Sequence, residues 1–300
     1  MRRFYYDVTA LCDNTIPTPL ADLSINDSFT LPESIVHHWC RVLRAKVSDV
    51  ALLFDGFGGE YQAELIEVSK KNARAKLLAF DPIERTPNIM TTIGLVMSRG
   101  DRMDYAIQKA TELGVSAIQL LTSHHGEVSL KSSQVPKKLL HWQQVAIAAC
   151  EQCGLNRPPL IFAPLSIEDW LKSETDKSVD LALQSQQVSP IVEPLLRQSY
   201  YANLQLTASL RLVLAVPNTA EVNNQHLSAS IIEQIQQAFQ AAQSSPCCFK
   251  LLIGPEGGLS SSELELAYST GFEAWQIGKR VLRTETAPVV ALATLHALCR

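Results

Sequence analysis

Two short segments near the C-terminus carry the residue types most able to do chemistry. The first reads IGPEGGLSSSELE, at residues 253–265, and the second reads IGKRVLRTETAP, at residues 277–288. Each follows an apolar run typical of a buried strand and precedes a helical pattern. Glycine lets a backbone approach a ligand closely, and a helix N-terminus offers free N–H groups. Both segments are therefore candidate ligand-binding loops.

The residues of the first loop argue against a phosphate ligand. The loop matches neither the P-loop pattern nor the G-x-G-x-x-G pattern, and Glu256 stands in the middle of the turn with no lysine after it. A carboxylate would repel a phosphate at close range, so a neutral or cationic group fits better. In the second loop, Thr284 and Thr286 are N-cap candidates, and Pro288 occupies an early helical position.

The surrounding elements place both loops at one edge of a sheet. From residue 91 onward, strand-length apolar runs alternate with helical patterns, which predicts an α/β domain with a mostly parallel sheet covered on both faces. Loops at the carboxyl ends of neighbouring strands face one crevice, where open α/β sheets bind ligands. Each loop alone could equally be structural, with Arg280 and Arg283 as solvated charges, but the pair favours a site. The polar stretch 173–208, with a strand predicted at 179–184, is the least constrained part.

The first 83 residues form a different pattern. Three strand-length runs are split by turn signals, at residues 50–56, 60–69 and 73–80. A proline and an acid precede an apolar helical pattern within 29–46, which predicts a short helix. The segment 81–88 carries two prolines and is the predicted linker. We therefore predict a small barrel-like domain at residues 1–83 and the α/β domain at 84–300.

Composition limits the classes of protein that fit. Apolar residues make up 46 % and charged residues 19 %, which is typical of a soluble globular protein. No apolar run approaches the ~18 residues of a membrane span, and no apolar block follows Arg2 and Arg3, so we expect a cytoplasmic protein. A net charge of −4 neither requires nor excludes nucleic acid. Cys150 and Cys153 lie in a helical pattern without a second metal-ligand pair, so we expect no metal.

The two loops together resemble a known family, the RsmE-type small-subunit ribosomal RNA (uracil-N3)-methyltransferases of the SPOUT superfamily. The same likeness extends through nearly the whole chain and is least clear at 173–208. It is carried by the segments MRRFY, HHWCRVLRAK, FDGFGGEYQAEL, MSRGDRMDYAIQKATELGV and WQQVAIAACEQCGLNRPP. The resemblance implies an N-terminal PUA-like RNA-binding β-barrel and a C-terminal methyltransferase domain with a trefoil knot. It also implies a homodimer that uses S-adenosylmethionine to methylate N3 of one uridine in 16S rRNA of the small ribosomal subunit.

S-adenosylmethionine carries a sulfonium cation and no phosphate, so this cofactor is compatible with Glu256. The resemblance assigns the cofactor pocket to the ends of three strands and the two loops, namely Leu214, Pro217, Ile253, Gly254, Pro255, Glu256, Gly257, Gly258, Ile277, Gly278, Val281, Leu282, Thr284 and Thr286. Removing the N3 proton of uracil calls for a base and a cation near the methyl group. Arg283 is the candidate for holding the uracil anion. Glu285 is the candidate base or orients Arg283, unless it only caps or pairs locally.

Candidate RNA contacts come from both domains. They are Arg41, Arg44 and Lys46 in an acid-free stretch, Arg99 and Arg102 in a loop that the family uses for RNA, and Arg157. Alternatives stay open for several of these positions. The first three could be a solvated helix face, and Arg102 could pair with an acid of its own helix. His37 and His38 are better explained as packing or capping residues, and Trp39 as a core residue.

Two positions depart from the family pattern. His124 and His125 stand where the family often has an arginine, and so does Leu155. Both changes remove cations from the expected RNA-facing surface. A methyltransferase for another RNA nucleotide, or a non-catalytic RNA-binding protein of ribosome assembly, therefore remains an alternative. The intact loops argue against the second, and the sequence leaves open the exact nucleotide, the assembly stage of the substrate, the identity of the base and the dimer interface.

Overall fold

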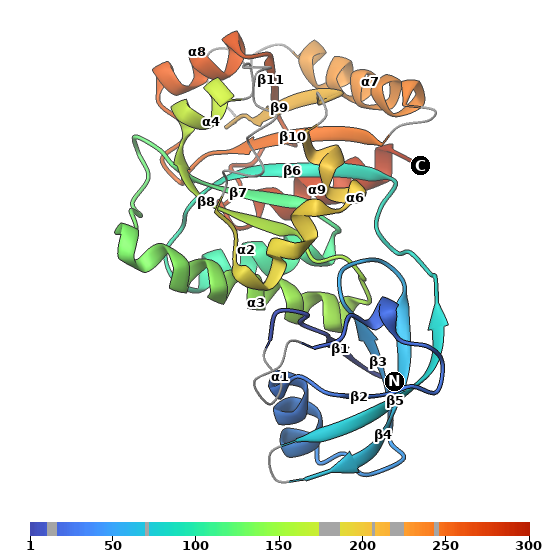
Figure 1. Ribbon diagram of the computed structural model, residues 1–300. Coiled ribbons are helices and arrows are strands. Elements are labelled where there is room, and N and C mark those ends of the chain that lie inside the picture. The colour runs from blue at the N-terminus through green and yellow to red at the C-terminus, as the bar shows by residue number, and fades with distance from the viewer. Residues whose placement is uncertain (11–16, 70–71, 174–186, 206–207, 217–224, 243–245) are drawn as a thin grey trace. The chain divides into compact units, whose positions relative to one another are not determined.

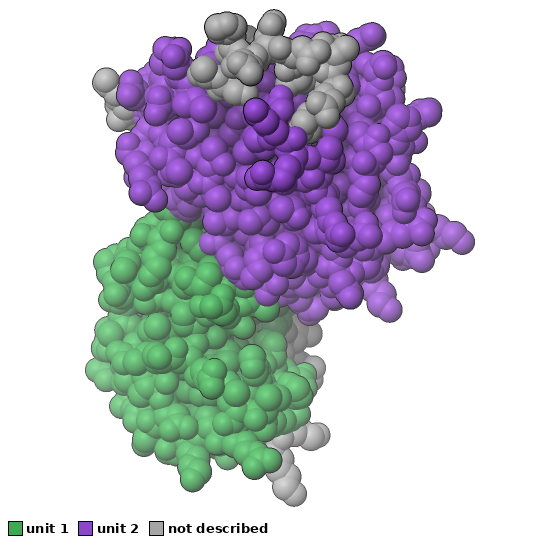
Figure 2. All heavy atoms as spheres, turned by 180° about the vertical axis from the view of Figure 1, so that it is seen from behind, with its two compact units in different colours: residues 1–86, 147–158, 193–195 green, residues 87–146, 159–192, 196–300 purple. Residues whose placement is uncertain are grey.

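The computed structural model describes residues 1–300 except 11–16, 70–71, 174–186, 206–207, 217–224 and 243–245 (Figure 1). The chain divides into two compact units, coloured in Figure 2. Unit 1 comprises residues 1–86, 147–158 and 193–195, and unit 2 comprises 87–146, 159–192 and 196–300. Two later segments therefore belong with the N-terminal unit, which a division into contiguous domains does not provide for. The strand predicted at 179–184 lies outside the described residues.

Unit 1 is built on a five-stranded sheet in the order β1-β3-β4-β5-β2. The strands are β1 (Arg2–Tyr5), β2 (Ser28–Thr30), β3 (Val50–Phe54), β4 (Glu60–Val68) and β5 (Ala73–Asp81). The three predicted strands correspond to β3, β4 and β5. Alternate residues of β4, Tyr61, Ala63 and Leu65, are buried in the core of the unit, as expected for a strand with one covered face.

The helix predicted inside this unit exists but is mostly of π type. A short α1 (Glu33–Ile35) continues into η2 (Val36–Val42), and a 3₁₀ turn, η1 (Leu20–Asp22), precedes β2. In η2 the N–H of Leu43 donates to the carbonyl of His38 at 3.0 Å. Trp39 is buried in the core, which confirms that prediction. Arg44 follows with a positive φ of 57°, a conformation uncommon for a residue with a side chain.

Unit 2 contains a six-stranded sheet in the order β11-β9-β10-β6-β7-β8 (Figure 1). Its strands are β6 (Ile89–Val96), β7 (Ala117–Thr122), β8 (Leu160–Ser166), β9 (Leu210–Leu214), β10 (Cys247–Ile253) and β11 (Phe272–Trp275). Every pairing in this sheet is parallel, which confirms the α/β prediction. From β6 the order runs to β7 and β8 on one side and to β10, β9 and β11 on the other. Such a switch point leaves a crevice at the carboxyl ends of the strands.

Helices cover both faces of this sheet. The α-helices are α2 (Asp101–Glu112), α3 (Val135–Cys153), α4 (Ile167–Ser173), α6 (Ser199–Ala202), α7 (Gln225–Ala241), α8 (Ser261–Ser269) and α9 (Ala287–Leu298). The 3₁₀ helices are η3 (Ser132–Gln134), η4 (Pro190–Arg197) and η5 (Asn203–Gln205). Leu251 of β10 packs in a cluster with α2, α7 and α9, whereas its neighbour Leu252 packs in a second cluster with α4 and α8. Because side chains alternate along a strand, the two clusters lie on opposite faces.

Helix α9 is apolar because it packs against its own unit. Ala291, Leu292 and Leu295 are fully buried in the first of these clusters. Among the described residues no helix combines the length and apolarity that crossing a membrane requires. In the same part of the chain, no three His, Cys, Asp or Glu side chains group as ligands for a metal ion.

Candidate functional site

A cavity of about 270 Å³ lies at the carboxyl ends of β9, β10 and β11. Both loops singled out in the sequence line it, together with the end of β9. The lining residues are Leu214, Ala215, Val216, Ile253, Gly254, Pro255, Glu256, Gly257, Gly258, Leu259, Leu264, Tyr268, Trp275, Ile277, Arg280, Val281, Leu282, Thr284 and Ala287. Two loops separated in sequence by a helix and a strand thus enclose one space.

The first loop connects β10 to α8 by a turn that depends on glycine. Gly258 has a φ of 74°, which a side chain would disfavour, and its N–H donates to Pro255 at 2.9 Å. A Cβ on Gly254 would lie 3.0 Å from Leu259 Cγ. The loop is therefore closely packed on itself while its outer side lines the cavity.

The N-terminus of α8 is occupied by its own capping residues. Ser260 Oγ accepts from the Glu263 N–H at 3.3 Å, and the Ser260 N–H donates to Glu263 Oε2 at 2.8 Å, which forms a capping box. This arrangement uses donors that an anion would need at a helix N-terminus. Together with Glu256 it supports the prediction that the loop does not cradle a phosphate.

The second loop runs from β11 to α9 and contacts the first. Thr286 is the N-cap of α9, although its side chain makes no capping hydrogen bond. Thr284, the other N-cap candidate, is buried instead, and its Oγ1 donates to the carbonyl of Gly254 at 3.3 Å. Thr284 thus joins the two loops.

Most of the predicted cofactor-binding residues line the cavity. Gly278 and Thr286 do not, and Pro217 lies outside the described residues. The predicted wall from Leu214 to Pro217 includes Ala215 and Val216, which also line the cavity. Sequence reasoning missed Leu259, Leu264, Tyr268, Trp275, Arg280 and Ala287. Leu264 and Tyr268 stand four apart on α8 and so share one face of that helix, a signal that was present in the sequence.

Among the described residues that line the cavity, the charged side chains are those of Glu256 and Arg280. Arg102, in the first turn of α2, donates to Glu256 Oε1 at 2.8 Å. Arg102 therefore pairs with the first loop and not with an acid of its own helix. Both side chains are about half exposed, so this ion pair contributes little to stability. Arg99 makes a second exposed ion pair, with Glu127 at 3.2 Å.

Arg283 and Glu285 lie beside the cavity but do not line it. The Arg283 side chain is 78 % exposed, whereas that of Glu285 is 12 % exposed, and Nη1 of Arg283 lies 3.8 Å from Glu285 Oε1. The other carboxylate oxygen of Glu285 is buried and has no hydrogen-bond partner among the described residues. This geometry combines a reachable cation with a carboxylate that retains free accepting capacity.

The turn after β7 contacts the first loop. The N–H of His124 donates to Glu263 Oε1 at 2.9 Å, and Nδ1 of His125 lies 3.3 Å from the carbonyl of Gly258. Both histidines are exposed. The position where an arginine was expected is therefore next to the glycine-rich loop.

In unit 1, the predicted RNA contacts separate into two groups. Arg41, Arg44 and Lys46 are exposed around the end of η2. Arg157 is not an exposed cation, since its side chain is 15 % exposed and Nε donates to Glu84 at 2.7 Å. Its guanidinium also donates to the carbonyl of Phe57 at 3.0 Å. These donors of Arg157 are therefore used within unit 1, and its contact with RNA stays a prediction.

Leu155 is likewise a structural position. It is 7 % exposed, and its carbonyl accepts a hydrogen bond from Arg3 at 3.2 Å. Because this position is buried, the leucine does not remove a cation from the exposed surface. The substitution therefore does not weaken the case for RNA binding.

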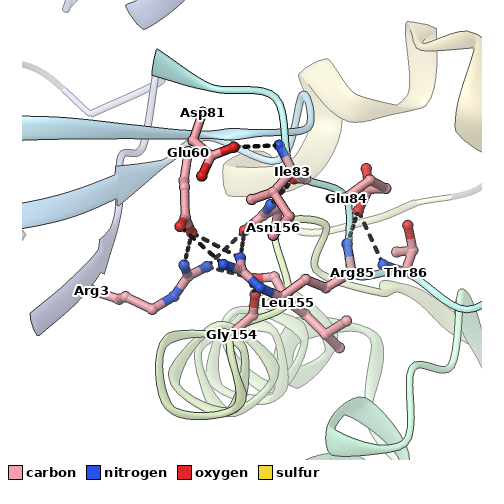
Figure 3. Close-up of polar contacts among 10 residues, drawn as sticks. All are labelled: Arg3, Glu60, Asp81, Ile83, Glu84, Arg85, Thr86, Gly154, Leu155 and Asn156. Atoms are coloured by element: carbon pink, nitrogen blue, oxygen red, sulfur yellow. Dashed lines mark hydrogen bonds and ion pairs between the residues drawn. The ribbon is translucent and has the colours of Figure 1, made fainter. Parts of the chain in front are cut away.

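A charged network also lies inside unit 1 (Figure 3). Arg85 donates to both oxygens of Glu60, at 2.9 and 3.0 Å, and Arg3 pairs with the same carboxylate. Asn156 accepts from Arg3 at 2.8 Å and donates to the carbonyl of Ile83 at 2.7 Å. Burial raises the pKa of Glu60, but hydrogen bonds from Arg85 and Arg3 outweigh burial and hold that pKa below its ordinary value. The network joins β1, β4, the linker and the segment after α3.

Comparison with known proteins gives consistent matches. The model of the RNA methyltransferase domain family matches residues 84–213 and 204–296, and that of the RNA methyltransferase PUA domain matches 31–78. The ribosomal RNA small subunit methyltransferase E of Buchnera aphidicola subsp. Schizaphis graminum is 28 % identical over 274 residues, which cover 91 % of this chain and 92 % of that protein.

Two solved structures are similar over nearly their whole length. A putative methyltransferase from Legionella pneumophila, in complex with the bound cofactor SAM, is 26 % identical with a TM-score of 0.71, and the match covers 98 % of this chain and 96 % of that one. A ribosomal RNA small subunit methyltransferase E from Neisseria gonorrhoeae bound to S-adenosyl methionine is 27 % identical with a TM-score of 0.70, and the match covers 99 % and 98 %.

Proposed function

Because this chain belongs to the RNA methyltransferase family, we propose that it transfers a methyl group from S-adenosylmethionine to N3 of a uridine in 16S rRNA. The observation that carries the proposal is the cavity formed by the two loops and the end of β9. Unit 1, which contains the PUA-like domain, would bind the RNA. The specific atom N3 rests on the family resemblance of the motifs.

The residues around the cavity fit S-adenosylmethionine. The volume of the cavity, about 270 Å³, lies just below the usual range for small-molecule pockets, roughly 300–1,000 Å³. The lining is mostly apolar, as the adenosine portion requires, and the capped α8 with Glu256 disfavours phosphate-bearing cofactors. When bound, S-adenosylmethionine supplies a methyl group activated by its sulfonium cation. Leu214, Ile253 and Leu282 would hold the adenosine.

The chain's own residues would help to deprotonate the uracil at N3 and would hold the resulting anion. N3 of uracil is a weak acid that is neutral at pH 7, so its proton must leave and the resulting anion must be held. The exposed guanidinium of Arg283 would hold that anion. Glu285 would steady Arg283 through Oε1 and accept the proton or a hydrogen bond through Oε2, which has no partner among the described residues.

RNA would be positioned by cations away from the reacting base. Arg41, Arg44 and Lys46 would contact phosphates, which orient a nucleic acid without reading its sequence. Arg99 and Arg102 would act near the cavity. If the target uridine lies in structured RNA, it must leave its stack to reach the cofactor.

We propose that the C-terminal segment of the chain is knotted and that the protein forms a homodimer. The resemblance implies that the segment around β11 and α9 threads a loop to form a trefoil knot, which would be one of the rare knotted folds. The hydrogen bond from Thr284 to Gly254 and the burial of α9 are compatible with such threading. A homodimer with the site near its interface belongs to the same proposal.

The decisive experiment supplies methyl-labelled S-adenosylmethionine and small ribosomal subunits that lack the modification, followed by nucleoside analysis of the RNA. Label recovered as 3-methyluridine at one position is the expected result. Label in another nucleoside would favour the alternative RNA methyltransferase. Absence of label together with absence of cofactor binding would favour a non-catalytic RNA-binding protein. A thermal-shift measurement supplies that second piece of information, because a ligand that binds only the native state raises the midpoint.

A further inference from the structure

Arg280 is a cation of the cavity wall. It follows β11 in the second loop, it is exposed, and it lines the cavity. Within the described part of the chain, no carboxylate or carbonyl oxygen is hydrogen-bonded or ion-paired to its guanidinium. The other cations nearby differ, since Arg102 is held by Glu256 and Arg283 does not line the cavity.

The cavity separates apolar surface from charge. Much of the lining is apolar, with side chains such as Leu264 and Leu282. Trp275 adds an apolar ring that carries one donor, its indole N–H. Among the described lining residues, charge comes from Glu256 in the first loop and Arg280 in the second. Both charged side chains are exposed, so they stand where the cavity meets solvent. A ligand with an apolar body and a charged end would place that end there.

S-adenosylmethionine has such an end, because its amino-acid portion carries a carboxylate and an ammonium group. We propose that Arg280 binds the carboxylate of this portion and so orients the cofactor, an inference that rests on the proposed function. Guanidinium groups suit this task because their planar donors match the two oxygens of a carboxylate. Glu256, which accepts from Arg102 through Oε1, also gives this end of the cavity the opposite charge for the ammonium group.

Arg280 differs from its neighbour in the same loop. Lys279 is also an exposed cation, but it does not line the cavity. General electrostatic attraction of the loop for ligands would therefore involve both residues, whereas carboxylate binding would involve Arg280. Lys279→Gln is consequently a matched control for Arg280→Gln, since both substitutions remove one positive charge from adjacent positions.

The test is calorimetric titration of the full-length protein and the two variants with two ligands. S-adenosylhomocysteine carries the amino-acid portion, and 5′-methylthioadenosine lacks it. For Arg280→Gln we expect about tenfold weaker binding of S-adenosylhomocysteine, the scale of a hydrogen-bonded charge pair that is partly solvated. Binding of 5′-methylthioadenosine should stay unchanged, which also shows that the variant is folded. Lys279→Gln should leave both affinities unchanged, and Arg280→Lys should restore part of the loss.

Three other results would overturn the inference. Equal weakening of both ligands would mean that Arg280 supports the loop and not the carboxylate. Unchanged affinity for both, with weaker RNA binding, would assign Arg280 to an RNA phosphate. Failure of the unaltered protein to bind either ligand would refute the proposed cofactor itself, and the inference would fall with it. In steady-state kinetics, we expect Arg280→Gln to raise KM for S-adenosylmethionine and largely to retain kcat, because the carboxylate contact contributes to cofactor binding.

Discussion

Oγ1 of Thr284 lies 3.3 Å from the carbonyl oxygen of Gly254, and this hydrogen bond joins the two loops that line the cavity. Thr284 is 4 % exposed, so water does not readily replace the lost donor. Thr284→Val keeps the side-chain shape and removes the hydroxyl. We expect about fivefold weaker binding of S-adenosylhomocysteine, corresponding to about 1 kcal/mol for one hydrogen bond. Calorimetric titration measures this affinity. Thr284→Ser keeps the hydroxyl and should bind S-adenosylhomocysteine as the unaltered protein does. Equal affinities for the Val and Ser variants would contradict the role of this bond.

Arg283 is predicted to act on the uracil and not on the cofactor. Its side chain is 78 % exposed and outside the cavity lining. Arg283→Ala should therefore bind S-adenosylhomocysteine as the unaltered protein does, while turnover on small subunits falls at least about a hundredfold, as for other groups that stabilise developing anions. Single-turnover methyl transfer is the measurement. Lys279→Ala provides an exposed control in the same loop, and unchanged turnover in Arg283→Ala would remove this residue from the mechanism.

Much of the fold could be predicted because its elements follow local patterns. The alternation of strands and helices in unit 2 could be predicted from the sequence, since buried parallel strands are continuous apolar runs and their helices carry periodic apolar faces. The type of the helix at Val36–Val42 was not, because π geometry is rare and the apolar pattern of this segment, which places Trp39 in the core, is that of an ordinary helix.

The site was predicted where it depends on motifs and missed where it depends on packing. Gly254 and Glu256 were recognisable from one loop, whereas Tyr268 and Trp275 reach the same cavity from α8 and β11. Arg157 shows what local patterns leave out. A cation in a polar segment indicates an exposed side chain, but its contact with Glu84 joins positions 73 residues apart, which local patterns do not contain.

The exposed cations at the end of η2 can be tested through the salt dependence of RNA binding. Each phosphate contact adds about 0.7–0.9 to the slope of log affinity against log salt. We expect Arg41→Gln and Arg44→Gln each to weaken binding of a 16S rRNA fragment and to lower that slope by about one. Arg74→Gln changes another exposed arginine of unit 1 and should alter neither quantity. Filter binding at several salt concentrations is the assay, and an unchanged slope in both variants would show that these residues form a solvated face.

Glu60 should make the stability of unit 1 depend on pH. Its side chain is 5 % exposed, and its pKa in the folded protein is held below the ordinary value of 4.5 by Arg85 and Arg3 against the opposing effect of burial. A lowered folded pKa means that the stabilisation is fully present above about pH 4.5 and is lost as pH falls through the folded value. Glu60→Gln leaves the 9 % exposed Arg3 without its counter-charge, so we expect a loss of about 3 kcal/mol at pH 7.

The loss from Glu60→Gln should shrink below pH 4.5, because the unfolded state of the unaltered protein then binds a proton at Glu60 and is stabilised relative to the folded state. The folded protein itself gives up the interaction when the pH falls below its lower pKa. Urea unfolding followed from pH 7 to pH 3.5 measures the difference in free energy between the two proteins. Glu67→Gln, an exposed substitution on the same strand, should cost little at any pH. A gap between Glu60→Gln and the unaltered protein that stays constant down to pH 3.5 would mean that packing of the side chain, and not its charge, holds this part of unit 1 together.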